Sequence, residues 1–95
     1  KIDVKMLSLM ALYELLHHET AIASTESFKK MLASNKTLTE QYREKNRNFL
    51  SLLGNLIKAR IDNFEGSKDE LLKKIEETPV TANRKWLIKK TEELK

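Results

Sequence analysis

Apolar and polar residues follow the spacing of amphipathic helices along most of the chain. Apolar positions recur three and four residues apart in five segments, which places them on one face of a helix. The pattern predicts helices over residues 4–23, 26–34, 38–65, 68–77 and 82–94. We therefore expect an all-α fold: a small bundle of four to five helices, with one long helix over about 38–65. The whole chain, residues 1–95, is expected to form a single helical domain.

The first predicted helix is apolar on nearly every side. Nine of the eleven residues from Met6 to Leu16 are apolar, and a helix of this kind must be buried all round. A monomer of this size buries only about 60–65% of the surface that its unfolded chain exposes. We therefore expect a homodimer, or obligate pairing with a protein partner. The candidate protein interface consists of Met6, Leu9, Met10 and Tyr13.

Signals for helix ends separate the predicted segments. Thr25, or Ser24 before it, is expected to cap the second helix. Thr37-x-x-Glu40 and Ser67-x-x-Glu70 have the spacing of capping boxes, in which each side chain bonds the other residue's backbone amide. Gly66 is expected in the left-handed conformation that ends a helix, and Pro79 is expected to stop the fourth helix.

The predicted helix over 38–65 is long compared with the expected size of the whole domain. Some 28 residues span about 42 Å at about 1.5 Å per residue, whereas a domain of this length has a radius of gyration of about 12–13 Å. The helix is expected to overhang the body, bend, or extend into a partner. Gly54, inside this helix, suggests a close crossing with a second helix, because a missing side chain lets two axes approach.

Composition narrows the possible functions. The chain has no Cys, which excludes a disulfide framework and a Cys zinc site. Its net charge of +4 is spread along the sequence, whereas proteins that coat DNA are usually more basic and more clustered. The apolar run from Met6 to Leu16 is about half of the ~20 residues that cross a bilayer. We expect no membrane span and a cytoplasmic location.

Candidate catalytic and metal-binding residues are few. Glu14, His17 and His18 stand three and four apart and would share one edge of a continuous helix. Helical di-iron sites need two such Glu-x-x-His pairs and two further Glu, and this chain has no other His. The sequence also lacks a Gly-rich phosphate loop. We expect no metal, no cofactor and no enzymatic activity.

The last two predicted helices have the length pattern of a helix-turn-helix. Residues of the type that grip phosphate or read bases follow the turn. These candidate nucleic-acid contacts are Asn83, Arg84, Lys85, Lys89 and Lys90. The other interpretation is a closing helix that packs Trp86 and Leu87 inward and leaves its lysines in water.

The function that these patterns favour is a non-enzymatic protein-binding module: an adaptor, an inhibitor or a regulatory subunit acting through apolar helical surfaces. The alternative is nucleic-acid binding through the basic helix over 82–94. The salt dependence of the affinity distinguishes these two functions. Binding to phosphates weakens steeply as salt is raised, whereas binding through an apolar interface does not.

Overall fold

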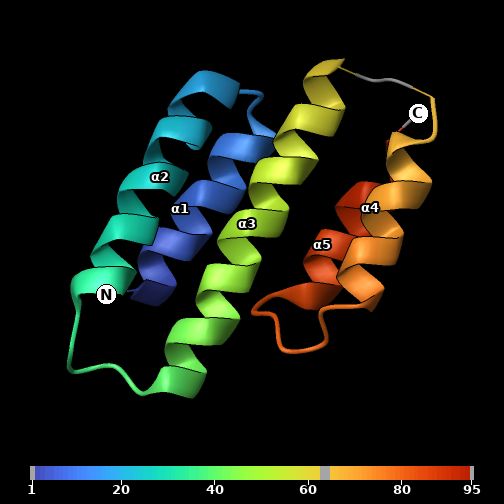
Figure 1. The fold of residues 1–95 in the computed structure, drawn as a ribbon. Coiled ribbons are helices and arrows are strands. Elements are labelled where there is room, and N and C mark those ends of the chain that lie inside the picture. The colour runs from blue at the N-terminus through green and yellow to red at the C-terminus, as the bar shows by residue number, and fades with distance from the viewer. Residues whose placement is uncertain (1, 63–64, 95) are drawn as a thin grey trace.

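Five helices joined by short connections make up the computed structural model, which describes residues 2–62 and 65–94 (Figure 1). The helices are α1 (Ile2–Glu14), α2 (His18–Ser34), α3 (Glu40–Asp62), α4 (Ser67–Glu76) and α5 (Arg84–Glu92). They hold 79% of the described residues, among which no strand occurs. The predicted all-α bundle is confirmed. Within the described ranges, no helix combines the length and the apolar character needed to cross a membrane.

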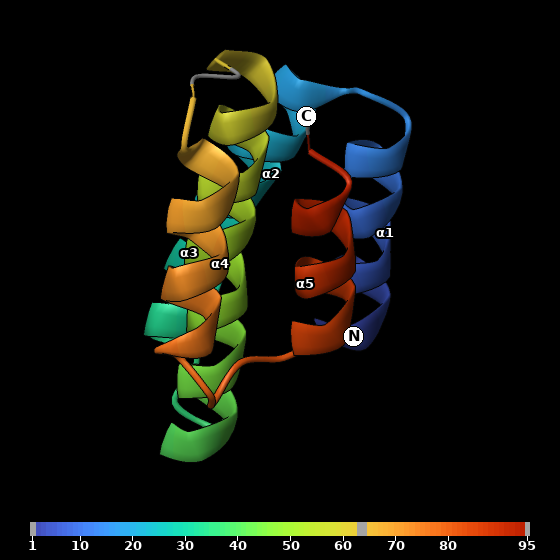
Figure 2. The same ribbon diagram turned by 90° about the vertical axis from the view of Figure 1, so that its right-hand side faces the viewer.

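The longest helix, α3, lies at the centre of the bundle. It packs against α2, α4 and α5, while α1 packs against α2 at the edge (Figures 1 and 2). Phe49, Leu53 and Leu56 of α3 are completely shielded from solvent. The other helices each contribute apolar side chains to the same core: Met6, Leu9 and Tyr13 from α1, Ala21, Phe28 and Leu32 from α2, Leu71 and Ile75 from α4, and Leu87 from α5.

The prediction of one helix over residues 4–23 is wrong, because the chain reverses between α1 and α2 (Figure 1). Two backbone hydrogen bonds close the turn: His17 N–H donates to Leu12 O at 3.0 Å, and Leu16 N–H donates to Tyr13 O at 3.1 Å. This is the Schellman motif, whose left-handed position usually holds glycine. Here Leu16 occupies it, with φ of 64°. A left-handed conformation costs an L-residue about 1–2 kcal/mol, so packing imposes this turn against the local preference.

The predicted helix boundary at Ser24 or Thr25 does not exist. Thr25 lies inside α2, is 3% exposed, and donates its hydroxyl to Ala21 O at 2.7 Å. A threonine that bonds the carbonyl four residues back satisfies its own polar group within the helix. The helix predicted over 26–34 is therefore the second half of α2.

The long helix is confirmed, but α3 is shorter than predicted. Its 23 residues span about 34 Å, which fits within the longest dimension of 41 Å. The first turns of α3 extend beyond the ends of the other helices (Figure 2), so part of the expected overhang is present. The helix begins near Thr39, whose Oγ1 accepts the Tyr42 N–H at 3.1 Å, while the Thr37 hydroxyl binds Asn35 instead. The predicted end near residue 65 adjoins residues 63 and 64, which lie outside the described residues.

The C-terminal helices α4 and α5 run antiparallel and lie side by side (Figures 1 and 2). Pro79 follows the end of α4, as predicted. The loop between them is fixed to α3: Ala82 N–H donates to Lys45 O at 3.0 Å, and the Asn48 side-chain amide donates to Val80 O at 2.8 Å. The hairpin is thereby held against the centre of the bundle.

The N-terminus of α4 differs from the predicted capping box. Gly66 is left-handed, as predicted, with φ of 85°, and it directly precedes α4. No side chain caps this helix, and Ser67 is 5% exposed and buried. The turn geometry of Gly66 therefore replaces the expected reciprocal pair of Ser67 and Glu70.

The two glycines are expected to respond oppositely to alanine. An added Cβ at Gly54 meets no atom within 4 Å, so the predicted close crossing is wrong. Gly54→Ala should stabilise the protein by about 1 kcal/mol, because glycine is a poor residue inside a helix. Thermal unfolding should show a Tm higher by about 4–8 °C. Gly66→Ala is the control: its positive φ disfavours a Cβ, so Tm should fall. A lower Tm for Gly54→Ala contradicts this account.

Candidate functional site

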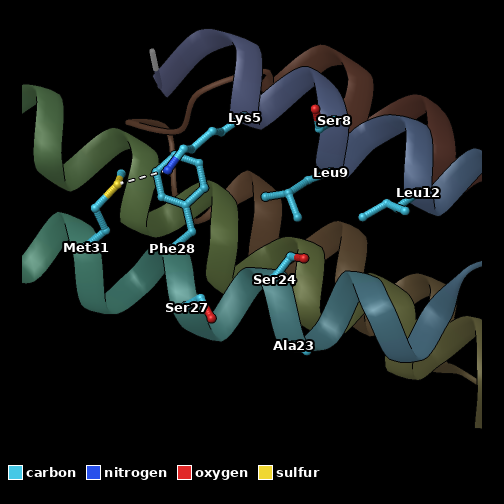
Figure 3. A pocket seen from close by; sticks show the side chains of 9 residues that line it. All are labelled: Lys5, Ser8, Leu9, Leu12, Ala23, Ser24, Ser27, Phe28 and Met31. Carbon is cyan, nitrogen blue, oxygen red and sulfur yellow. Dashed lines mark hydrogen bonds between the residues drawn. The ribbon is translucent and has the colours of Figure 1, made fainter.

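A groove runs between α1 and α2 on the surface of the bundle (Figure 3). Its volume is about 360 Å³. Apolar side chains form its floor, and small side chains of α2 form one wall. The lining residues are Lys5, Ser8, Leu9, Leu12, Ala23, Ser24, Ser27, Phe28 and Met31.

The outer side of α1 extends this groove into a wider surface of low charge. Val4 and Leu15 are 60% and 64% exposed. Val4 lies four positions from Ser8, and Leu15 lies four positions from Ala11, so they continue the side of α1 that borders the groove. Leu7 instead lines a hollow on the other side of α1, with Tyr42 and Ala82. We call the surface beside the groove the α1–α2 face; it comprises Val4, Lys5, Ser8, Ala11, Leu12, Leu15, Ala23, Ser24, Ser27 and Met31. Lys5 is its one charged member, although 34% of the chain is charged.

Lys5 carries the one charge in the groove lining. Its ammonium lies 5.7 Å from the centre of the Phe28 ring and 3.5 Å from the Met31 sulfur (Figure 3). Among the described residues, Lys5 makes no ion pair within 4.0 Å. A cation over an aromatic ring is stabilised by the ring's electron density, yet it still offers its charge to an approaching acidic group.

Of the predicted interface residues, only Leu9 lines the groove, at its floor. Met6, Leu9 and Tyr13 are 3%, 2% and 3% exposed and belong to the core, and Met10 is half-buried against it. The reason is geometric: α1 lies at the edge of the bundle, so one side of it is buried and the opposite side faces solvent. An exposed apolar surface does exist on α1, but Val4, Leu15 and their neighbours form it.

The histidines do not share a helix edge with Glu14. Glu14 ends α1, His17 lies in the turn and His18 begins α2. The Glu14 carboxylate forms an ion pair with Lys90, with 2.8 Å between Oε1 and Nζ. Within residues 2–62 and 65–94, no group of three or more His, Cys, Asp or Glu side chains is arranged to hold a metal ion.

The basic C-terminal helix uses two of its cations within the protein. Arg84 donates from Nε to Ile75 O at 3.4 Å, and Lys90 binds both Glu14 and Glu93. Lys85 and Lys89 are exposed. Asn83 precedes α5 in a left-handed conformation, with φ of 53°. The candidate nucleic-acid contacts therefore include two free lysines rather than a cluster of four cations.

The arrangement of α4 and α5 also differs from a DNA-binding motif. Helix-turn-helix motifs join their helices at about 90–120°, whereas α4 and α5 run antiparallel (Figure 2). Trp86 of α5 packs inward, with its ring 5.6 Å from that of Tyr13 and 6.3 Å from that of Phe49. These contacts agree with the interpretation of α5 as a closing helix.

Two cations attach the C-terminal end of α1 to the rest of the bundle. Arg60 of α3 donates to Tyr13 O at 2.7 Å, and its guanidinium lies 4.2 Å from the centre of the Tyr13 ring. Lys90 of α5, with a side chain only 11% exposed, binds Glu14. Positive groups at a helix C-terminus also complement its dipole. The end of α1 is thus fixed, and its side of low charge is held outward.

Comparison with known proteins gives no match: no family model, no curated protein and no solved structure is similar to the chain. The features that bear on function are therefore the geometry of the α1–α2 face and the distribution of charge.

The attachment of α1 predicts a loss of stability at high pH. The hydrogen bond to Glu14 raises the pKa of Lys90, and burial raises the pKa of Tyr13. Both groups hold their protons more tightly when folded, so their stabilisation is complete below the unfolded pKa values and is lost as pH rises through the folded ones. We expect the free energy of unfolding to fall above about pH 10.

Chemical denaturation at several pH values measures this dependence. Lys90→Met and Tyr13→Phe should each flatten the decline above about pH 10. Lys85→Met, which removes an exposed lysine of the same helix, serves as the control and should leave the slope unchanged. Equal slopes in all the proteins contradict the assignment.

Proposed function

We propose that this chain is a non-enzymatic protein-binding module, an adaptor, inhibitor or regulatory subunit, that binds a partner through the α1–α2 face. The low charge of this face carries the proposal, since Lys5 is the one charged residue among its ten members. Interface centres are depleted of charged residues relative to the remaining surface. The exposed Val4 and Leu15 add an apolar patch, of a kind that marks interaction sites.

An amphipathic helix of the partner is the ligand that this face fits best. A groove between two helices receives the apolar side of a third, with anchor residues three and four positions apart. The walls contain Ser8, Ala23, Ser24 and Ser27, and such small side chains let helix axes approach closely. Lys5, at one end of the groove, favours a partner helix with an acidic residue beside its apolar anchors.

Nucleic-acid binding through α5 remains the alternative, and it has weaker support. Arg84 and Lys90 already have partners within the chain, and a site that retains Lys85 and Lys89 makes few phosphate contacts. Salt separates the two functions. Affinity for a protein helix should change little between 50 and 200 mM salt, whereas about 6–10 phosphate contacts would lose about 10³–10⁵ in affinity.

The binding proposal predicts a specific effect of charge on the face. A photo-crosslinking residue at Ala11 should capture a protein from extracts of the native cells, and mass spectrometry would identify it. With the purified partner, Val4→Glu should weaken binding by about 30-fold or more, the effect of losing an apolar anchor.

Val80→Glu is the matched control. Val80 is also an exposed apolar residue, 43% accessible, but it lies in the loop between α4 and α5. Circular dichroism should show both variants folded, and Val80→Glu should bind normally. Equal affinity for Val4→Glu and the unmodified protein, or equal losses in both variants, contradicts binding at the α1–α2 face.

A further inference from the structure

The turn between α1 and α2 is a strained connection within a sequence that favours continuous helix. Leu16 adopts φ of 64° at a position where glycine is normal. The residues around it, from Tyr13 to Glu19, include neither glycine nor proline. Leu and Glu are among the better helix formers. The local sequence and the observed turn therefore disagree, and straightening the segment would relieve the strain.

Straightening would join α1 and α2 into one helix over residues 2–34, about 50 Å long. In that form α1 cannot fold back on its own α2. The buried side chains Met6, Leu9 and Tyr13 would then leave their place in the core, which we call the α1 cavity. They could be buried again only in the α1 cavity of another molecule. A second copy of this chain offers the identical cavity, which is the condition for exchanging an element between protomers.

The specific contacts of α1 can all be made by the α1 of a second copy. The pair of Glu14 and Lys90, and the contact of the Tyr13 ring with Trp86, both join α1 to α5. Each depends on the placement of α1 in its cavity and not on the path of the connection. Exchange therefore preserves the core and changes only the turn.

The exposed leucines at the turn give a second, independent indication. Leu15 and Leu16 are 64% and 59% exposed in the single chain. In an exchanged pair, the two straightened segments run antiparallel past each other at the two-fold axis. Each segment would cover the leucines of the other, which removes apolar surface from water. A short, strained connection is the type that promotes exchange.

We propose that this protein forms a dimer by exchanging α1 between two copies, with α1 and α2 joined into one helix. The dimer does not depend on the proposed function, because the groove re-forms between α1 of one copy and α2 of the other, and of the α1–α2 face only Leu15, beside the turn, would be covered. Exchange requires α1 to leave its core position, so the dimer should form during refolding at high concentration and convert slowly afterwards.

Two substitutions at one position test the role of the turn. Leu16→Gly removes the strain from the turn and weakens the continuous helix, so it should raise the dimer dissociation constant by about 100-fold or more. Leu16→Ala removes the same side chain but keeps a Cβ in the left-handed position and favours helix, so it should retain the dimer far better. Refolding at several hundred micromolar followed by sedimentation equilibrium measures both.

A crosslink identifies which chain supplies α1. Ser8 and Ser27 line the same groove from α1 and α2 (Figure 3), and the chain has no Cys of its own. In the Ser8→Cys/Ser27→Cys variant, a short bismaleimide should link two chains in the dimer fraction and close a loop within one chain in the monomer fraction. Denaturing electrophoresis separates these products.

Three outcomes overturn the exchange. The first is a monomer at every concentration after refolding. The second is a dimer whose groove crosslink stays within one chain. The third is a dimer that Val4→Glu dissociates and Leu16→Gly leaves intact, which would instead be two bundles joined through their α1–α2 faces. Loss of the exchanged dimer with normal partner binding would leave the proposed function standing.

Discussion

The burial of α3 is the constraint on which the rest of the structure depends. Phe49, Leu50, Leu52 and Leu53 are all buried, and these neighbouring positions point to several sides of the helix, so α3 needs several neighbours. The helices α2, α4 and α5 take those positions. A place at the edge remains for α1, where it packs on α2 and contacts α5 and the end of α3 through Tyr13 and Glu14. The exposed side of α1 therefore follows from the way the other helices divide the surface of α3.

Much of this fold could be predicted from the periodicity of apolar residues. In a helix with one apolar side, the spacing of these residues indicates both the length of the helix and the side that is buried. The regions of α3, α4 and α5 were recognisable in this way, and Pro79 marked a real end. The turn at Leu16 was not recognisable. Helix signals there are uninterrupted, and the turn is stabilised by distant groups, including Arg60, which lies 47 positions from Tyr13.

The candidate site shows the same limit. Apolar residues surround α1 so evenly that the sequence indicated surplus apolar surface without indicating its side. The choice between Met6 and Leu7 depends on where α2 and α5 lie, which is long-range information. One feature of the sequence could have indicated the groove. Ala23, Ser24 and Ser27 of α2 are small and uncharged, and they recur along one side of a helix in a highly charged chain. The ion pair of Lys90 with Glu14 is long-range information of the same kind, because the two residues are far apart in the sequence.

Trp86 is the single tryptophan of the chain, and it lies where α1, α3 and α5 meet, beside Tyr13 and Phe49. An indole in this position is a built-in optical reporter. Its emission depends on the cover that the Tyr13 and Phe49 rings give it, so fluorescence responds to the detachment of α1 as well as to the unfolding of the whole chain. An α1 from the same chain and an α1 from a second copy would cover the indole equally. The fluorescence therefore shows whether the α1 position is filled, but not which chain fills it.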